Sequence, residues 1–396
     1  MTLLSPPRSR PALIEAFTAP KGFGDQTLRD RRPDAIELLG GIPDPSVLPT
    51  AELAAATARV LSAPGAPSLQ YSRTEGIPAL REWIAAREGV AVDRVLITNG
   101  GFHGLAIAVQ TVLERGDLVV VDNPVFPLFL RGLELADARV LPIRVGADGL
   151  DVDALAAELR AGARPAAVYT VPEFHNPSQS SLPTARRREL VDLAERYGFV
   201  VFADDPYREL RFAGEPESIA PFHDSEHVIH VNTFTKTLGP GLRLGWVVLP
   251  ERLVPDAVAL RSRQDSHSST FVQAVVAELL TSDAGLFDRV LGRARALYRS
   301  RAHALADALS ASGAFDVTVP DGGLFLWPRL TDDSLDADRL AADASAEGVE
   351  YQRGSFFPSG PGTDADRHLR LAYGDTSEEL LREAAARLGR AVERQR

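Results

Sequence analysis

Six short apolar runs restrict the fold of this chain more than any other feature of its sequence. The runs cover residues 95–98, 118–121, 166–171, 199–203, 227–232 and 244–249. Each ends abruptly in polar or proline residues, and apolar helical stretches separate several of them. Runs of this length without alternation are typical of strands that are buried on both faces. The sequence therefore predicts an α/β fold with a mostly parallel sheet.

Apolar residues between two of these runs recur at helical spacing. They are Leu190, Val191, Leu193, Ala194 and Tyr197, and Gly198 follows them. Because glycine commonly ends a helix, we expect a helix that stops at Gly198 and leads directly into the next strand. The three elements form a βαβ unit, for which a right-handed crossover is expected.

The pattern changes after about residue 280, which suggests a second domain. The sequence there predicts a helix at 287–309, short strands at 315–319, 323–327 and 369–372, and a last helix that begins with Thr376 and Glu379 at capping-box spacing. We therefore expect a large domain at 51–280 and a small α+β domain at 281–396. The proline-rich residues 1–50 are expected to pack with the small domain.

Composition excludes several classes of protein and site. The chain of 396 residues has no cysteine, which excludes disulfides, zinc ribbons, iron–sulfur clusters and thiol nucleophiles. Its net charge of −11 disfavours binding to nucleic acid or to anionic membranes. The N-terminus lacks the apolar core of a secretory signal, and polar and glycine residues interrupt the apolar stretch 95–113. We expect a soluble, cytoplasmic protein.

Polar clusters directly follow the apolar runs, at the strand ends where open α/β sheets bind ligands. The glycine-containing turn 99–104 joins a strand to a helix, and the free N–H groups of such a turn suit a phosphate. Asn176 lies in a turn before a proline, and Asp204 and Asp205 follow a buried run. Taken singly, each cluster is ordinary turn or surface chemistry.

Two cations stand in apolar surroundings. Lys236 follows the run 227–232 among small and apolar residues, and burial would make its amine a usable nucleophile. Arg370 lies inside an apolar strand, and burial of its charge is costly unless an anion pairs with it. Together with the polar clusters they match pyridoxal phosphate chemistry, which needs an imine-forming lysine, an aspartate for the pyridine nitrogen, a phosphate cradle and an arginine for the substrate carboxylate.

The chain resembles the fold-type I pyridoxal phosphate enzymes, and among them the class I/II aminotransferases. It looks most like the subgroup of 2-aminoadipate and kynurenine aminotransferases. The resemblance covers nearly the whole chain and rests on Asn176-Pro177, on the Asp-Asp-Pro-Tyr sequence at 204–207 and on residues 233–246. It implies a three-layer α/β/α large domain and an enzyme that moves the amino group of an L-amino acid to a 2-oxo acid with pyridoxal 5'-phosphate.

The resemblance also implies residue roles. The catalytic residues would be Lys236, which forms the internal aldimine and moves the Cα proton, Asp204 at the pyridine nitrogen, and Tyr207. The cofactor-binding residues would be Gly100, Gly101, Phe102, Phe126, Asn176, Asp204, Tyr207, Thr233, Thr235, Lys236, Arg243 and Tyr71. The substrate-binding residues would be Gly41, Asn176 and Arg370. Because Tyr71 resembles a tyrosine that reaches the partner's phosphate site, a homodimer is implied.

Several residues depart from the family's usual sequence. His103 lies in the phosphate turn, and His175 stands before Asn176 where the family usually has glutamine. Each is either a packing residue or an acid–base group. The role of the polar segment 264–269 also stays open. Three further histidines, His223, His227 and His230, are expected in a solvated loop and not as metal ligands.

Two other functions compete with transamination. The same residues would suit a lyase, decarboxylase or oxidative deaminase of a modified amino acid in specialised metabolism, because the orientation of the substrate's Cα bonds decides the reaction. An effector-sensing domain of a transcription regulator is disfavoured, since only about fifty proline-rich residues precede the core.

Overall fold

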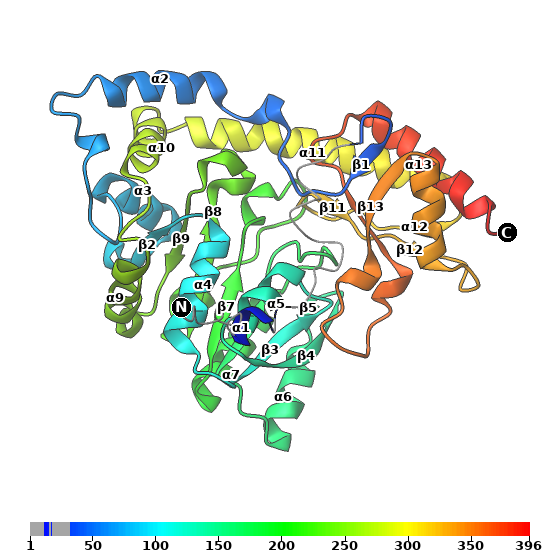
Figure 1. Cartoon of the computed structure of the whole chain (residues 1–396), viewed down its shortest axis with the longest axis horizontal. Coiled ribbons are helices and arrows are strands. Elements are labelled where there is room, and N and C mark those ends of the chain that lie inside the picture. Colours follow the sequence, from blue (N-terminus) through cyan, green and yellow to red (C-terminus); the bar gives the residue numbers. More distant parts are fainter. Residues whose placement is uncertain (1–11, 16, 18–31) are drawn as a thin grey trace, which may run out of the picture.

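The computed structural model describes residues 12–15, 17 and 32–396 (Figure 1). The expectation for the N-terminal ten residues, and much of that for segment 1–50, lies outside the described residues. The strands are β1 (Ile36–Leu38), β2 (Val95–Thr98), β3 (Leu118–Asn123), β4 (Arg139–Gly146), β5 (Gly149–Leu150), β6 (Ala167–Thr170), β7 (Val200–Asp204), β8 (Val228–Thr233), β9 (Gly245–Val248), β10 (Phe315–Asp316), β11 (Phe325–Leu326), β12 (Arg329–Leu330), β13 (Val349–Arg353) and β14 (Leu369–Ala372).

Helices connect and cover these strands. They are α1 (Ala12–Glu15), α2 (Thr50–Leu61), α3 (Pro78–Glu88), α4 (Gly101–Val112), α5 (Pro127–Glu134), α6 (Val152–Ala161), α7 (Thr184–Tyr197), α8 (Ala220–His223), α9 (Val254–Gln264), α10 (Thr270–Ser282), α11 (Leu286–Ala311), α12 (Ala337–Ala346) and α13 (Glu378–Glu393). Two short 3-10 helices, η5 (Arg208–Leu210) and η6 (Phe234–Lys236), follow β7 and β8.

The main sheet has eight strands in the order β2-β9-β8-β7-β6-β3-β4-β5. The five strands from β8 to β4 run parallel to one another. Strand β9 runs antiparallel to both β2 and β8, and β5 runs antiparallel to β4. Val119 and Val121 of β3 pack in one core with α4 and α5, and Val120 packs in another with α6, α7 and α8. Helices therefore cover both faces, which confirms the predicted three-layer, mostly parallel α/β fold.

The βαβ unit lies at the centre of this sheet. Helix α7 leaves β6 and ends at Gly198, which adopts a φ of +78°. The next strand, β7, then pairs in parallel with β6. Leu190 and Ala194 of the predicted apolar stripe are fully buried. The unit brings the carboxyl ends of β6 and β7 to the same edge of the sheet.

A smaller sheet lies beside the main one and has the order β1-β13-β14-β11. Its first strand comes from the N-terminal segment, and Ile36 pairs in parallel with Val349. The long helix α11 joins the two regions. Leu291 packs with Trp246 of the main sheet, whereas Leu305, further along the same helix, packs with Leu381 of α13. Figure 1 shows α11, in yellow, extending from the region of α10 to the region of β1 and α13.

Several predicted element bounds were wrong. The strands expected at 315–319 and 323–327 are only two residues long each, because they pair over two residues. Strand β4 was not predicted, since most of its residues are exposed or half-buried and give no apolar run. The last helix is capped by Ser377 and not by Thr376: the Oγ of Ser377 accepts a hydrogen bond from the N–H of Leu380.

The apolar stretch 95–113 is divided between β2 and α4. Among the described residues no single helix has both the length and the apolar character to cross a membrane; α10 and α11 together reach that length only across a bend of 93°.

Candidate active site

The predicted site residues gather at the carboxyl edge of the parallel strands. Asp204 is the last residue of β7, and Lys236 ends η6, which directly follows β8. Asn176 lies in the loop after β6. Because parallel strands end at a common edge, three separate strand ends bring their side chains to one place.

Lys236 lies under the N-terminal segment. Its Nζ donates a hydrogen bond of 2.7 Å to the carbonyl oxygen of Gly41, and it lies 5.8 Å from the centroid of the Tyr207 ring. Burial, with a contribution from the charge of Arg370, lowers the pKa of Lys236 from 10.5 to about 8, although Asp204 acts in the opposite direction. A substantial fraction of this amine is therefore neutral and nucleophilic near neutral pH.

Asp204 is a buried carboxyl group on the same edge. It accepts a hydrogen bond of 3.0 Å from the hydroxyl of Tyr169. Burial raises the pKa of Asp204 to about 7; Asp205 adds to the effect, and the bond from Tyr169 opposes it. A cationic ring nitrogen beside this carboxyl group would restore its charge, as a pyridinium partner requires.

Arg370, Asn176 and Tyr207 form a second group around Lys236. The Nη1 of Arg370 donates a hydrogen bond of 3.0 Å to Oδ1 of Asn176, and its guanidinium lies 4.2 Å from the centroid of the Phe325 ring. Burial lowers the pKa of Arg370 to about 9 and raises the pKa of Tyr207. A substrate carboxylate would offset the cost of burying the Arg370 charge.

A cradle for a phosphate lies at the start of α4. Gly100 has a φ of +85°, and a Cβ on it would lie 2.7 Å from Nη2 of Arg243. The Oγ1 atoms of Thr233 and Thr235 are 2.7 Å apart, and a Cβ on Gly101 would lie 3.6 Å from the side chain of Thr233. A guanidinium, two hydroxyls and a helix N-terminus therefore converge, which suits a phosphate dianion.

Two predicted aromatic residues lie at the starts of neighbouring helices. Phe102 is the second residue of α4 and is about half exposed. Phe126 precedes α5 and packs against the main core.

Within one copy of the chain, Tyr71 lies apart from the other predicted site residues. Its side chain is 93% exposed, and its ring meets that of His267 at 5.8 Å. An exposed tyrosine here is available to a second copy of the chain.

The sequence analysis missed several buried groups beside the site. Tyr169 gave no signal because an aromatic residue in an apolar strand is ordinary. Asp122 was taken as the residue after a strand, but it lies within β3, where its Oδ2 accepts from the N–H of Val171. That oxygen also lies 3.2 Å from Nε2 of His175. The contact was not predictable because it joins residues from two distant segments.

The two departing histidines are both packed within the structure. His175 is buried, and its Nδ1 lies 2.8 Å from the Oγ of Ser178. His103 accepts a hydrogen bond of 3.1 Å at Nδ1 from the N–H of Asn99. Segment 264–269 reaches the same turn, because Asp265 accepts a hydrogen bond of 2.6 Å from the Asn99 amide.

The expectation of a solvated histidine loop was wrong for two of its three members. His223 and His230 are buried, and their rings meet at 4.9 Å. His227 is only half-buried, and its Nδ1 lies 3.0 Å from the carbonyl oxygen of Phe199. The error arose because spacing in the sequence does not reveal that α8 and β8 pack together.

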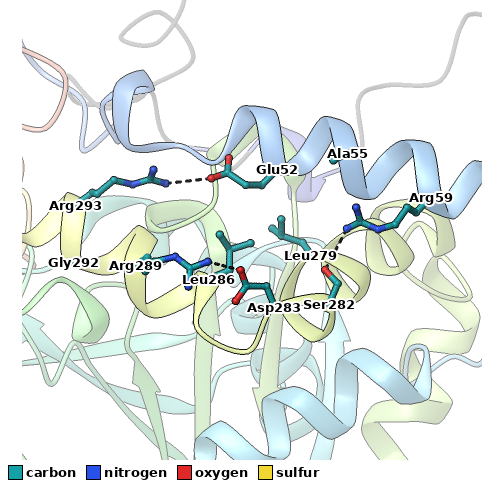
Figure 2. Close-up of a pocket in the computed structure, with 10 residues that line it drawn as sticks. All are labelled: Glu52, Ala55, Arg59, Leu279, Ser282, Asp283, Leu286, Arg289, Gly292 and Arg293. Atoms are coloured by element: carbon teal, nitrogen blue, oxygen red, sulfur yellow. Dashed lines mark hydrogen bonds and ion pairs between the residues drawn. The ribbon is translucent and has the colours of Figure 1, made fainter.

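A surface pocket of about 580 Å³ lies away from these residues, between α2, α10 and α11. Figure 2 shows that its charged side chains pair with one another: Arg293 lies 3.7 Å from Glu52, and Arg289 contacts Asp283. It contains none of the predicted site residues, so we assign the chemistry to the sheet edge.

The residues at the sheet edge fit pyridoxal 5'-phosphate. The Gly100–Arg243 cradle suits its phosphate, and the raised pKa of Asp204 suits a partner with a cationic ring nitrogen. The lowered pKa of Lys236 suits an amine that must attack an aldehyde.

Comparisons with known proteins agree with this arrangement. A family model described as aminotransferase class I and II matches residues 41–388. The 2-aminoadipate transaminase of Thermus thermophilus is 34% identical over 91% of this chain and 91% of that protein. The aromatic-amino-acid aminotransferase 1 of Thermococcus litoralis is 30% identical over 91% of this chain and 88% of that protein.

Solved structures include a similar fold. The α-aminoadipate aminotransferase of Thermus thermophilus, complexed with N-(5'-phosphopyridoxyl)-L-leucine, has a TM-score of 0.84 and 33% identity to this chain. The match covers 93% of this chain and 95% of that one.

Proposed function

The chain belongs to the family of class I and II aminotransferases, and on this premise we propose that Lys236, Asp204 and Tyr207 are its catalytic residues. The protein is a pyridoxal phosphate-dependent aminotransferase that moves an amino group from an amino acid to a 2-oxo acid. One observation carries the residue assignment: the buried amine of Lys236, with its pKa lowered to about 8, lies beside Tyr207 and within the electrostatic reach of Asp204.

When bound, pyridoxal phosphate supplies an aldehyde that takes up the amino group and a ring that withdraws electrons from the substrate's α-carbon. Lys236 holds the cofactor and moves the proton at the α-carbon through its Nζ. The carboxylate of Asp204 holds the proton on the ring nitrogen. Asn176 and Tyr207 donate to the ring oxygen, and Phe126 packs on the ring face.

The remaining residues bind the two anionic groups. The backbone N–H groups of Gly100, Gly101 and Phe102, the hydroxyls of Thr233 and Thr235, and the guanidinium of Arg243 bind the phosphate. Arg370 binds the α-carboxylate of the substrate, with the Gly41 backbone beside it. The contact of Arg370 with Asn176 supports this role, because the same amide then faces both cofactor and substrate.

We include a homodimer in the proposal, with Tyr71 contributed to the phosphate site of the partner. Two observations support it. Tyr71 and the neighbouring Leu69 are strongly exposed. A groove of about 510 Å³ beside α4 has an apolar lining that includes Phe102, Leu105 and Leu260, which a second copy would cover.

The proposed substrates follow the two named relatives, a 2-aminoadipate transaminase and an aromatic-amino-acid aminotransferase. We propose an amino acid with a long acidic or an aromatic side chain, used in amino acid biosynthesis in the cytoplasm, where 2-oxo acids are available. No observation favours the alternative of a lyase, decarboxylase or oxidative deaminase.

The proposed domain division keeps the bounds 1–50, 51–280 and 281–396. The separate sheets support it, because β1 pairs with β13 and not with the main sheet.

The catalytic lysine can be tested directly because the chain has only two lysines, Lys21 and Lys236. Borohydride reduction of the holoenzyme should fix the cofactor on the peptide that contains Lys236, as mass spectrometry would detect. Lys236→Ala should abolish transamination, and Lys21→Ala should leave it unchanged. Turnover by Lys236→Ala, or label on Lys21 alone, would refute the assignment.

A further inference from the structure

A chain of hydrogen-bond contacts runs through the two buried histidines on the far side of β8. Nδ1 of His223 lies 3.0 Å from the backbone carbonyl oxygen of Glu88. Nε2 of His223 lies 3.1 Å from Nδ1 of His230, and Nε2 of His230 lies 3.1 Å from Oδ2 of Asp205. All four residues are buried. The proposed function uses none of them.

This series of hydrogen-bond contacts needs more protons than two neutral imidazoles can supply. A carbonyl oxygen and a carboxylate stand at its ends, and both can only accept. Three contacts therefore require three protons, whereas two neutral histidines carry one N–H each. With only two protons, one of the three contacts would bring two lone pairs together at 3.0 to 3.1 Å inside the protein. A third proton must therefore lie on one of the groups in this series of contacts.

The contacts place the third proton on His230, because its ring meets the carboxylate of Asp205 at 3.1 Å, whereas the outer nitrogen of His223 meets a neutral carbonyl oxygen. Burial acts to raise the pKa of Asp205, but the hydrogen bond from His230 and the charge of Arg208 together lower it, so Asp205 is ionised. Burial, and next to it the charge of His230, lowers the pKa of His223 to about 3, so that ring is neutral. His230 can then donate from both of its nitrogens.

The charges that face the pair balance when it carries one proton. Glu88 and Asp205 are acids, and Arg208 contacts both: its Nη2 donates to the two carboxylate oxygens of Glu88 at 2.9 and 2.8 Å, and its Nε lies 3.6 Å from Asp205. Two negative charges then meet two positive charges, which is the state that burial favours.

Other elements add a neutral donor to Glu88, a further cation at the backbone of His223, and more distant charges. Trp246 of β9 donates to Glu88 at 3.2 Å, and Arg94 donates to the carbonyl oxygen of His223 at 2.7 Å. Arg187 and Glu173 act on Asp205 from further away and carry opposite charges.

A divalent metal would suit the same nitrogens less well. Glu88 is the acid that groups with His223 and His230 as a possible ligand set. Both of its carboxylate oxygens already accept hydrogen bonds from Arg208. A metal would bring two positive charges beside that guanidinium and leave a net positive charge in the core.

The pair lies directly behind the proposed cofactor site. His230 is opposite Ala203 in the register of β7 and β8, and Val231 is opposite Asp204. Because side chains alternate along a strand, Asp204 and Asp205 point to opposite sides of the sheet. The charge of Asp205 raises the pKa of Asp204, after the larger effect of burial. A cation on His230 offsets that repulsion.

We propose that His223 and His230 form a buried pair that carries one proton, and that His230 is a positioning residue which keeps Asp204 ionised for the cofactor's ring nitrogen. The second part rests on the role proposed for Asp204. The first part does not, because it follows from the contacts of His223, His230 and Asp205 alone.

The protonation state can be measured by two-bond proton–nitrogen NMR on holoenzyme with ¹⁵N-labelled histidine. At pH 8 we expect one histidine with both nitrogens protonated, and its signals should vanish in His230→Gln. The control His227→Gln should remove a different set of signals. Neutral patterns for both His223 and His230, or one equivalent of divalent metal by elemental analysis, would overturn the proposal.

The effect on the site can be measured as the dissociation constant of pyridoxal 5'-phosphate. His230→Gln should raise it about tenfold, and His227→Gln should not change it. In an Asp204→Asn background the effect of His230→Gln should vanish, because coupled residues are not additive. An equal effect in both backgrounds would overturn the positioning role.

A rescue variant keeps the test decisive if His230→Gln folds poorly. His230→Gln combined with Asp205→Asn removes the positive and the negative charge together, and it should restore folding and cofactor affinity. Failure of the rescue would contradict the electrostatic role. If Asp204→Asn alone leaves affinity unchanged, the proposed role of Asp204 fails, whereas the protonated pair seen by NMR stands.

Discussion

Burial shifts the two central ionisable groups of the site in opposite directions. It raises the pKa of Asp204 to about 7 and lowers the pKa of Lys236 to about 8, because a low-dielectric site disfavours either charge. The two groups therefore change protonation close to neutral pH. A proton at Lys236 can therefore move at little cost in free energy, which suits the group proposed to move the α-proton.

The pH dependence of cofactor uptake tests the shift at Lys236. Only the neutral amine attacks an aldehyde, so the rate at which the apoprotein captures pyridoxal 5'-phosphate should rise with pH and level off above about 8. Stopped-flow absorbance measures this rate. A rate that still climbs tenfold per unit at pH 10 would mean that the amine keeps its usual pKa.

Arg370 gives a second test at the level of one side chain. Arg370→Lys keeps the charge but loses the two-pronged geometry that fits a carboxylate. One charge-assisted hydrogen bond is worth about 2 kcal/mol, so kcat/KM should fall roughly thirtyfold. The loss should appear mainly in KM for the amino acid. The exposed Arg339→Lys is the control, and equal losses in both variants would contradict the role of Arg370.

Individual site residues were predictable where they belong to a compact sequence motif. Lys236, Asp204 and Asn176 each follow an apolar run, and the structure brings them to one edge. The partners that tune them were not predictable. Tyr169 and His230 lie inside apolar strands, and their contacts depend on which strands are neighbours.

Among the elements, the junction of β2 with α4 carries the proposed phosphate cradle. Gly100 is needed there for two reasons: its φ is +85°, and Arg243 occupies the space that a Cβ would take. Gly116 has a similar φ of +82° but open space around it. A substitution at Gly116 therefore tests backbone strain alone, whereas one at Gly100 tests backbone strain together with a Cβ that fills the space beside Arg243.

Gly100→Ala and Gly116→Ala form a matched pair of variants. Gly116→Ala should lower the free energy of unfolding by about 1 kcal/mol, because a positive φ disfavours a Cβ. Gly100→Ala should lower it by at least as much, because φ +85° with ψ 171° is a conformation that residues other than glycine rarely adopt. Only Gly100→Ala should also weaken binding of pyridoxal 5'-phosphate, by about tenfold, as measured by equilibrium titration. If both variants bind the cofactor equally well, Gly100 does not form the cradle.

Elements with continuous apolar runs were predictable, including the edge strand β2, and elements without such a run were not. The five residues of β7 are all buried, so their run is continuous in the sequence. By contrast, most residues of β4 are exposed or half-buried and one of them is Pro142, so β4 has no apolar run. The short strands β10 and β11 pair over two residues each, and such brief pairing depends on tertiary packing.

At the scale of the whole molecule, α11 belongs to two of the hydrophobic cores, through Leu291 and Leu305. The main sheet and the small sheet therefore share a rigid element. The proposed homodimer adds a second shared element, since Tyr71 would complete the site of another copy. The first relation was not predictable because it needs the packing of a helix. The second was implied by the resemblance of Tyr71 to a tyrosine that reaches the partner's phosphate site, and it stays a prediction.

Mixing two inactive variants tests the homodimer and the reach of Tyr71 together. Lys236→Ala has no catalytic amine, and Tyr71→Ala should bind the phosphate weakly. In a mixed dimer, one site combines an intact Lys236 with an intact Tyr71 from the other copy, so activity should recover to about a quarter of the wild-type value.

The measurement is the transamination rate after the two variants are unfolded and refolded together. Each variant refolded alone is the control. If Tyr71 serves its own chain, or if the protein is a monomer by light scattering, mixing restores nothing.

The pairing of β1 with β13 also has a consequence for synthesis on the ribosome. Ile36 emerges early, yet its partner Val349 follows about three hundred residues later. At a translation rate of ~5–20 residues per second, β1 must wait roughly 15–60 s for its neighbour. The main sheet can form during that wait, and the first strand of the small sheet is then added among the last steps of cotranslational folding.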